Sequence, residues 1–171
     1  MIQIHKANET NTEVLALLGM VTYKESHGPF VDDKNDLLIY NETAFSVSKT
    51  KKGINNPDNL FYLVYKDDFP IGYAKLILNT THDNVVDQSS CQIERLYILE
   101  DFIPLKVGQP LLEFIENKAK EFKLDTMWLS VHVKNTRAMR FYKKNGFREV
   151  ANSSFQLNGK AYDNMIFLKQ V

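Results

Sequence analysis

The sequence predicts a mixed α/β fold in which a central sheet of six or seven strands carries helices on both faces. Three observations lead to this prediction. Short runs of β-forming residues alternate with longer segments whose apolar residues repeat every three to four positions. A strand, a helix and a second strand follow one another between residues 91 and 132, which predicts a right-handed parallel crossover. Hairpin turns make the remaining strand pairings antiparallel.

The N-terminal part of the chain is typical of a short strand followed by two helices. Apolar and polar residues alternate over the first five positions, as they do in a strand. Asn8 and Thr10 offer caps for the first helix, which ends at Gly28. The second helix is expected from about Asp32, its expected cap, to Phe45.

The rest of the chain supplies most of the expected sheet. The polar stretch 46–59 is expected to be a loop, and residues 79–90 a polar connection between strands. The expected elements are strands at 60–65, 71–78, 91–99 and 126–132, helices at 107–122 and 135–145, and a closing hairpin that turns at Asn158-Gly159.

Length, composition and charge restrict the kind of protein further. The 171 residues, 44% of them hydrophobic, suffice for a single domain over residues 1–171 that buries roughly 70% of its unfolded surface. Lys and Arg total 21, as do Asp and Glu, and this zero net charge disfavours a nucleic-acid partner. The chain contains no long apolar run and no signal-peptide pattern, which predicts a cytoplasmic protein without a membrane partner.

The sequence predicts no metal site. Cys91 is the single cysteine, which rules out an intramolecular disulfide and a zinc cluster of paired cysteines. His27, His82 and His132 lack the spacing of metal ligands. Cys91 itself is expected to be a small buried apolar residue rather than a nucleophile.

The first candidate binding site is the strand at 91–99 together with the start of the helix that follows it. Free amides at a helix N-terminus, together with the helix dipole, bind anions. Gly108 removes a side chain where a phosphate needs to approach the backbone, and Pro110 fits the first helical turn. The simpler interpretation is a helix that merely follows a strand, and a lone glycine does not decide between the two.

A second stretch is the short helix near residue 140. Asn135 and Tyr142 are seven positions apart, so two helical turns bring them to nearly the same face. Between them, Ala138 leaves room for a ligand beside that face. The simpler interpretation is a capped helix that buries Met139 and Phe141.

Together the two stretches resemble the GCN5-related N-acetyltransferase (GNAT) family. Residues Ile93–Ile98 are similar to the strand that binds acetyl-CoA in that family, and Val107–Leu112 to the end of its pyrophosphate loop with the following helix. The run Asn135–Phe147 is the most recognisable signature. Within the family, the chain is most similar to PaiA-type polyamine acetyltransferases. The resemblance implies a sheet in which two parallel strands splay apart at the cofactor cleft.

The resemblance also assigns residues to the binding of acetyl-CoA as co-substrate. The backbone of the 96–98 segment is expected to pair with the pantetheine arm, and the amides near 108 to hold the pyrophosphate. The assigned positions are Leu96, Tyr97, Ile98, Lys106, Val107, Gly108, Gln109, Asn135, Tyr142 and Lys143. For Lys143, an exposed surface lysine is the simpler interpretation.

One loop departs from the family pattern, which reads Gln/Arg-x-x-Gly-x-Gly/Ala. Here Ile103 replaces the polar residue, Lys106 replaces the first glycine, and Gly108 is kept. Lys106 either clashes with the phosphates or turns outward and contributes its positive charge. The departure motivates a second hypothesis, in which the chain is a catalytically weakened acyl-CoA-binding or regulatory module on the same fold.

The resemblance further implies how the reaction proceeds. A primary amine of a small molecule attacks the thioester directly in a ternary complex. Glu94 is the candidate base, directly or through water, and its alternative is a salt-bridged glutamate. Tyr142 is the candidate acid for the CoA sulfur, because a phenol is largely protonated at neutral pH.

The acceptor amine is expected to meet the first two helices and the loop between them. Tyr23, His27 and Asp32 are the candidate contacts. With Asp33 and Asp36, Asp32 forms an acidic cluster that suits a polyamine, the leading candidate acceptor. The simpler interpretation of these carboxylates is a solvated helix start. By resemblance, a homodimer is also expected to be possible.

Overall fold

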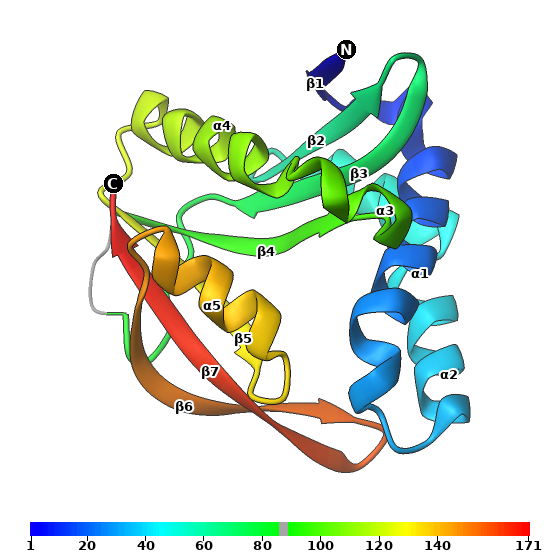
Figure 1. Ribbon diagram of the computed structural model, residues 1–171, viewed down its shortest axis with the longest axis vertical. Helices are drawn as coiled ribbons and strands as arrows, with labels where there is room; N and C mark the ends of the chain where they lie inside the picture. The colour runs from blue at the N-terminus through cyan, green and yellow to red at the C-terminus, as the bar shows by residue number, and fades with distance from the viewer. Residues whose placement is uncertain (86–88) are drawn as a thin grey trace.

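Seven strands form one mixed sheet in the order β1-β2-β3-β4-β5-β7-β6 (Figure 1). The structure is a computed structural model and describes residues 1–85 and 89–171. Of the predicted polar connection at 79–90, residues 86–88 therefore lie outside the described part. The strands are β1 (Ile2–Lys6), β2 (Asn59–Lys66), β3 (Phe69–Ile77), β4 (Ser90–Ile98), β5 (Thr126–His132), β6 (Arg148–Leu157) and β7 (Lys160–Gln170).

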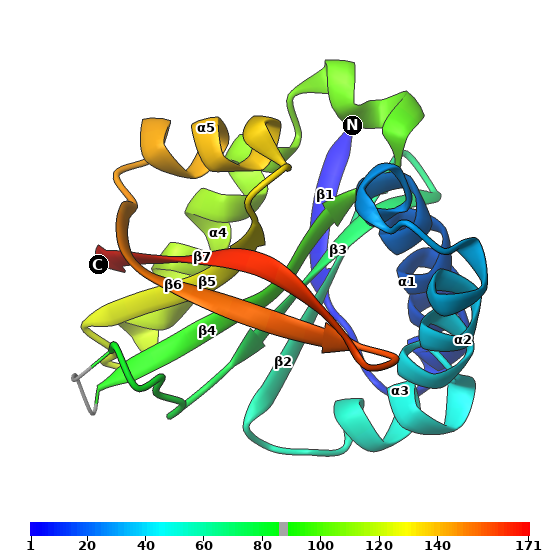
Figure 2. The same cartoon turned by 90° about the horizontal axis from the view of Figure 1, so that it is seen from below.

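All neighbouring strands are antiparallel except β4 and β5, which are parallel. The predicted crossover between residues 91 and 132 is confirmed, because helix α4 connects these two strands. The predicted mixed sheet with helices on both faces is also confirmed, as Figure 2 shows with α1–α3 on one side and α4 and α5 on the other. The helices are α1 (Thr12–His27), α2 (Lys34–Ala44), α3 (Val47–Ile54), α4 (Gly108–Glu121) and α5 (Thr136–Lys144).

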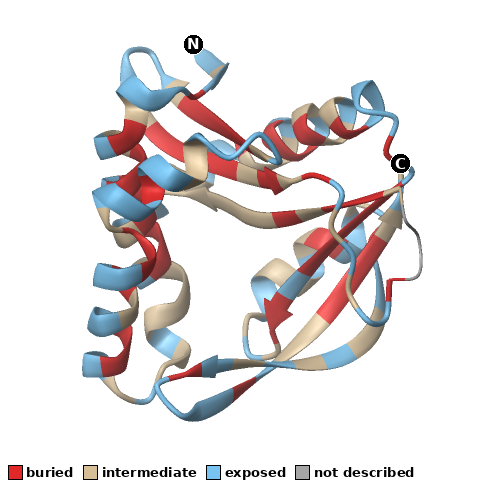
Figure 3. Ribbon diagram, turned by 180° about the vertical axis from the view of Figure 1, so that it is seen from behind, coloured by how far each residue is buried: buried red, intermediate tan, exposed pale blue. Residues whose placement is uncertain are grey.

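The apolar residues divide between the two faces of the sheet. On the α4 side, Leu111, Leu112 and Ile115 are at most 1% exposed and pack with the strands in the largest core cluster. Ile115 lies four and three positions after Leu111 and Leu112, so the three residues form one stripe of α4. Figure 3 shows this burial on the strands and its alternation with exposure along the long helices. The sheet is thus fixed on both faces and holds the site rigidly.

Two predictions for the N-terminal half are wrong. Residues 46–59 were expected to be a loop, but α3 occupies Val47–Ile54 and is capped by the Ser46 hydroxyl, which accepts from the Lys49 amide. The lysines and Gly53 of this short helix hid its pattern. Helix α2 is capped by Asp33, not Asp32, because the Asp33 carboxylate accepts from the Asn35 amide. A 3₁₀ helix, Glu100–Leu105, also occupies most of the connection before α4.

The closing hairpin forms as predicted and reaches across to the α2 helix (Figure 1). Asn158 and Gly159 both have positive φ, 47° and 78°, as the predicted two-residue turn requires. At the hairpin tip the side chains of Asn158 and Lys160 donate to the Asp36 carboxylate at 2.6 and 2.9 Å. The hairpin is therefore tied to α2 at this point.

Candidate active site

The parallel strands β4 and β5 pair at one end and separate at the other. Pairing covers residues 90–92 of β4 with residues 126–128 of β5 and then stops. On the other edge of β4 the register with β3 shifts, because Leu76 pairs with Ile93 and Lys75 with Arg95. Glu94 is the extra residue of this β-bulge. The predicted splay is present where the pairing stops.

The separated half of β4 turns unused backbone groups toward β5. The Leu99 amide donates to the Ile71 carbonyl at 2.9 Å. In this part of β4, the backbone groups of the odd-numbered residues therefore form the hydrogen bonds to β3. Because hydrogen-bonded residues alternate in an antiparallel ladder, the amides of Leu96 and Ile98 point away from β3 and toward β5. Because β5 pairs with β4 only as far as Gln92, these amides face the gap as an open sheet edge.

A groove of about 1100 Å³ runs along this gap. Residues of β4, β5, the connection before α4 and helix α5 form its walls. Five Lys and Arg side chains contribute to the lining, against three carboxylates; they are Arg95, Lys106, Lys134, Arg137 and Lys144, with Glu25, Glu94 and Glu100. The groove therefore suits a long anionic ligand with an apolar arm.

The start of α4 provides an anion site at one end of the groove. Lys106 lies in the left-handed region with φ 57°, and Val107 follows with right-handed angles. This succession turns consecutive amides to one side, forming a backbone nest. Among the described residues, the amides of Val107 and Gly108 have no hydrogen-bond acceptor. Lys106 thus adopts the left-handed conformation that glycine favours, at the position where the family pattern has its first glycine.

Helix α5 forms the opposite wall and is held at its start by Asn135. The Asn135 side chain accepts from the Ala138 amide at 3.1 Å, which is the predicted cap. Tyr142 is 8% exposed and stands edge-on to the rings of Phe141 and Phe147. Burial raises the pKa of the Tyr142 phenol well above 10. The phenol therefore lines the groove in its protonated, proton-donating form.

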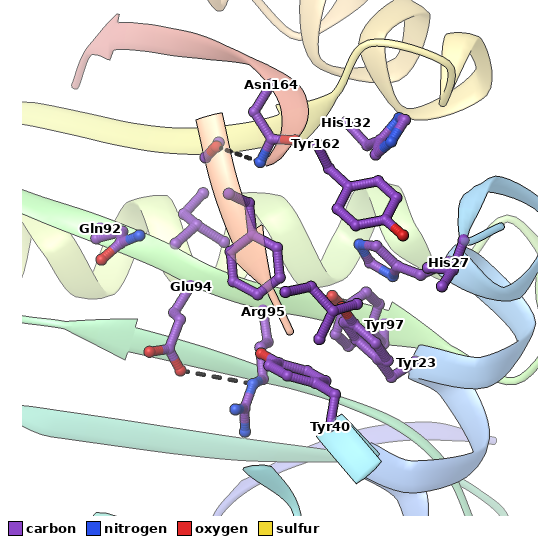
Figure 4. A pocket seen from close by; sticks show the side chains of 15 residues that line it. Tyr23, His27, Tyr40, Gln92, Glu94, Arg95, Tyr97, His132, Tyr162 and Asn164 are labelled. Carbon is purple, nitrogen blue, oxygen red and sulfur yellow. Dashed lines mark hydrogen bonds and ion pairs between the residues drawn. The ribbon is translucent and has the colours of Figure 1, made fainter. Parts of the chain in front are cut away.

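A second, smaller cavity of about 270 Å³ adjoins the groove on the α1–α2 side of the sheet. Its walls are mainly aromatic, and Figure 4 shows rings from α1, α2, β4 and the β6–β7 hairpin facing one another. The aromatic lining residues are Tyr23, Tyr40, Tyr97, Phe155 and Tyr162. Tyr40 and Phe155 meet edge to face at 5.5 Å, where α2 and the hairpin close over the cavity.

The charged floor of the cavity comes from the bulge. Glu94 and Arg95 both line the groove and the cavity, because the extra residue turns consecutive side chains to the same face. The Glu94 carboxylate lies 2.6 Å from the Lys75 ammonium and 3.5 Å from Nε of Arg95. The Arg95 guanidinium in turn lies over the ring of Phe45 at 4.4 Å. Glu94 is thus a salt-bridged carboxylate at the junction of the two spaces.

Two neutral imidazoles stand at the same junction. His27 stacks on Tyr23 at 4.1 Å, and its Nδ1 is 2.7 Å from the Ser26 hydroxyl. Burial lowers the pKa of His27 to about 4, and burial also lowers the pKa of His132. Nδ1 of His132 accepts from the Lys134 amide at 3.0 Å, so its Nε2 carries the proton.

The structure brings most of the predicted site residues together. The groove contains Glu94, the 96–98 segment, Lys106, Gly108, Gln109, Asn135 and Tyr142, and the cavity contains Tyr23 and His27. Asp32 and Lys143 line neither space, and Lys143 pairs with Glu149 at 2.8 Å. Val107 is not among the residues that line the groove, and its side chain is buried in the core.

Sequence reasoning gave no role to several lining residues. Arg137 and Lys144 share the seven-residue spacing of Asn135 and Tyr142, and that spacing was a usable signal. Tyr162 offered no such signal, because it reaches the cavity only through the pairing of a distant hairpin with β5.

Comparison with known proteins decides the family. The model of the acetyltransferase (GNAT) family matches residues 17–147. The chain belongs to this family. The resemblance predicted from the sequence is confirmed, and the enzyme class is that of the N-acetyltransferases.

Relatives and solved structures cover nearly the whole chain. An uncharacterized N-acetyltransferase in the pepI 3' region of Lactobacillus delbrueckii subsp. lactis is 26% identical over 156 residues, 91% of this chain and 90% of the relative. A PaiA N-acetyltransferase from Thermoplasma acidophilum in complex with coenzyme A shares the fold with a TM-score of 0.78 and 22% identity, over 100% of this chain and 99% of that one. A probable acetyltransferase from Staphylococcus epidermidis has a TM-score of 0.76 at 17% identity, over 99% of both chains. At 17–22% identity, these two solved structures show that the fold is shared.

The described residues contain neither a cluster of metal-ligating side chains nor a membrane-spanning helix. In residues 1–85 and 89–171, no group of three or more His, Cys, Asp or Glu side chains is arranged to hold a metal ion. No helix in the same ranges has the length and apolar character that a membrane span requires.

Proposed function

We propose that this GNAT protein transfers the acetyl group of acetyl-CoA to the primary amine of a small molecule, by direct attack in a ternary complex. One observation carries the proposal: a groove with free backbone amides and a buried phenol opens, between splayed parallel strands, onto a separate aromatic cavity. The two spaces share Glu94, Arg95 and Tyr97. Two ligands can thus meet at β4.

The groove residues fit acetyl-CoA, which supplies the acetyl group as an activated thioester. The open edge at Leu96 and Ile98 pairs with the pantetheine arm as an added strand would. The amides of Val107 and Gly108 hold the pyrophosphate, and Lys106 adds positive charge beside them. Gln109 and Asn135 keep their predicted contacts in this proposal, whereas Lys143, which lies outside the groove and pairs with Glu149, has no part in it.

Proton transfer is the task of the residues at the junction. An amine with a pKa near 10.4 must lose a proton before attack, at a cost of roughly 4.6 kcal/mol at pH 7. Glu94 is proposed to accept that proton, directly or through water, in an orientation fixed by Lys75 and Arg95. Tyr142 is proposed to donate to the leaving sulfur, since burial keeps its pKa high and its phenol protonated.

The acceptor is proposed to enter the aromatic cavity, with Tyr23 and His27 among its contacts. A polyamine is the acceptor that the sequence favours. The acting unit is proposed to be the single domain 1–171, because one sheet takes strands from both ends of the chain. The cytoplasmic location and the homodimer stay predictions from the sequence.

The second candidate function is an acyl-CoA-binding or regulatory module with weakened catalysis. Ile103 and Lys106, where the family loop has other residues, favour it. In this case the protein binds acetyl-CoA, and Tyr142→Phe has no effect on any rate.

The test combines binding with turnover. A ligand at 100 times its Kd stabilises the folded protein by about 2.7 kcal/mol, so acetyl-CoA is expected to raise the melting temperature clearly. Release of CoA is then followed with a panel of primary amines. Turnover that depends on Tyr142 supports the proposed function. A melting shift without any turnover supports the binding module, and the absence of a shift contradicts both.

A further inference from the structure

The carboxylates expected to meet a polyamine lie outside the acceptor cavity. Asp36 is 3% exposed and is bound by Asn158 and Lys160 of the hairpin tip. Asp33 caps α2, and Asp32 is exposed to solvent. None of these three residues lines the cavity. A polycation in the cavity would therefore find none of its expected partners.

The floor of the cavity itself carries one carboxylate, Glu94, and one guanidinium, Arg95, and the Lys75 ammonium outside the lining shares the same carboxylate. Glu94 lies between Lys75 and Arg95, whose side chains are 12% and 17% exposed. Among the described residues, Glu94 is the one carboxylate that pairs with either cation. Burial lowers the pKa of Lys75, and the nearby charges of Arg95 and Lys49 lower it further, while Glu94 opposes them. A second anion beside Arg95 would balance this group.

The walls add apolar surface and one unused polar group. The Tyr162 hydroxyl is buried and has no hydrogen-bond partner among the described residues. Figure 4 shows it pointing toward His27, with the other rings around the same space. His27 and His132 contribute no charge at neutral pH, because burial lowers the pKa of both. A buried hydroxyl without a partner costs free energy that a polar ligand group would recover.

This inference rests on the proposed acetyl transfer and names its acceptor. We propose that the acceptor is a small primary amine that carries one carboxylate and an apolar or aromatic side group, as free amino acids do. The carboxylate binds at Arg95, whose planar guanidinium matches it. The side group packs among the rings, and the Tyr162 hydroxyl contacts a polar atom of the acceptor.

The chemical balance of the step is simple. The amine nitrogen forms a bond to the thioester carbon, and the carbon–sulfur bond breaks. Two protons leave the ammonium nitrogen, the first to Glu94 before attack and the second as the carbon–sulfur bond breaks. Tyr142 gives one proton to the sulfur and is reprotonated from solvent, so one proton in total is released to solvent. The products are an N-acetylated amino acid and CoA, and no oxidant or reductant is needed.

The cavity favours a free small molecule over a peptide. The hairpin closes the side toward α2 through the Asp36–Lys160 ion pair, at 2.9 Å, and the contact between Tyr40 and Phe155. A volume of about 270 Å³ behind this closure suits one amino acid rather than an extended chain.

The experiment compares amines that differ only in the carboxylate. Release of CoA is measured with phenylalanine and phenethylamine, tyrosine and tyramine, leucine and 3-methylbutylamine, and with spermidine. A charged hydrogen-bonded pair corresponds to a preference of about 10- to 100-fold. We expect kcat/KM for at least one amino acid to exceed that of its matched amine by this factor. The same amino acid should also have a higher kcat/KM than spermidine.

Variants then tie the preference to the cavity. In Arg95→Met the ratio of kcat/KM between an amino acid and its matched amine falls toward one, and Arg95→Lys retains part of it. Arg148→Met, at an exposed arginine of β6 outside the cavity, leaves the ratio unchanged. Each variant is first shown to be folded by its melting shift with acetyl-CoA. Tyr162→Phe raises KM for the acceptor several-fold without loss of stability, because the hydroxyl has no partner to lose.

The outcomes separate the two proposals. Two outcomes overturn this inference and leave the acetyltransferase proposal standing. One is a kcat/KM for spermidine above that of every amino acid, and the other is an equal kcat/KM for each amino acid and its matched amine. No turnover with any amine overturns both. A ratio that survives in Arg95→Met also overturns the inference, because the preference then has another source.

Discussion

The two ends of the β4–β5 pair differ although the same two strands form them. At the paired end, Ser90, Cys91, Thr126 and Met127 are all 0% exposed. At the separated end, residues 94–98 of β4 are only partly buried, and the groove and the cavity meet there. One strand pair thus supplies both core and site, and the division falls next to the bulge at Glu94.

The comparison explains how a rigid sheet can hold a site with exposed backbone. Loops usually carry binding groups because strands use their amides in pairing. Here β4 keeps its partner β3 on one edge and loses β5 on the other, so its amides are free while its position stays fixed. The paired end of β4 and β5 is therefore structural, and the separated end is functional.

The largest effect is expected at the open end, from Tyr142→Phe. Loss of the proton donor is expected to lower kcat by about 100-fold or more, because general acids contribute roughly 10²- to 10⁴-fold. The ring packing is retained, so the melting temperature changes little.

The wild-type rate should keep rising with pH through about 9, because more of the amine is deprotonated. Burial holds the pKa of the Tyr142 phenol high, so the proton donor is not lost over this range. Tyr62→Phe, a buried tyrosine outside the groove, is the matched control. Equal kcat in Tyr142→Phe and the control would contradict the assigned role.

At the paired end, Met127→Ala is expected to affect stability rather than binding. Met127 is 0% exposed within the main core, and such truncations cost about 2–5 kcal/mol. Urea unfolding should show this loss, while the Kd for acetyl-CoA of the folded protein changes less than about threefold. Leu17→Ala, at a residue that is 64% exposed, should stay within about 0.5 kcal/mol of the wild type. A large change in Kd for Met127→Ala would show that the two ends are not separable.

The neutral imidazole of His27 predicts a pH-dependent stability. Its folded pKa of about 4 lies below the ordinary 6.5, so the unfolded chain binds the proton more readily. The contribution of His27 to the free energy of unfolding is therefore full above about pH 6.5. It is lost as the pH falls toward 4, and the total loss is up to roughly 3 kcal/mol. Unfolding curves of the wild type and His27→Gln measure it as a difference in slope over this range. His5→Gln, at an exposed histidine, is the control, and identical slopes for all three proteins would refute the prediction.

The smallest effect is expected from Gly108→Ala. A Cβ there would lie 3.7 Å from the Phe141 ring, an ordinary contact, so the fold accepts it. In the groove the methyl group stands beside the free amide, and the Kd for acetyl-CoA should rise about 3- to 10-fold. Gly53→Ala in α3, with a Cβ 3.4 Å from the Phe61 ring, should leave the Kd unchanged. Unaltered affinity in Gly108→Ala would remove Gly108 from the proposed anion site.

Much of the fold was readable from local patterns, and the exceptions have physical causes. The stripe of α4 was visible because burial on one face dictates its period, and β4 was visible as a run of residues between a polar stretch and a helix. Helix α3 was not, because only its ends are apolar and lysines fill its middle. The cap at Asp33 rather than Asp32 is a one-residue shift that two adjacent aspartates make ambiguous.

In the site, too, features set by local sequence could be predicted and features set by strand register could not. Gly108, Asn135 and Tyr142 were identified because each lies in a contiguous motif. The pairing of Glu94 with Lys75 and the unpartnered Tyr162 hydroxyl depend on strand register across the sheet, which no local pattern contains. The charge of the acceptor cavity could therefore be judged only after the strands were placed.

Hydrogen exchange with and without acetyl-CoA tests the central claim most directly. On saturation, the amides of Leu96, Ile98, Val107 and Gly108 should gain protection, while those of residues 90–92 keep their already slow exchange. Protection confined to other parts of the molecule, or none at these four amides at saturating acetyl-CoA, would contradict a thioester held at the open end of β4 and β5.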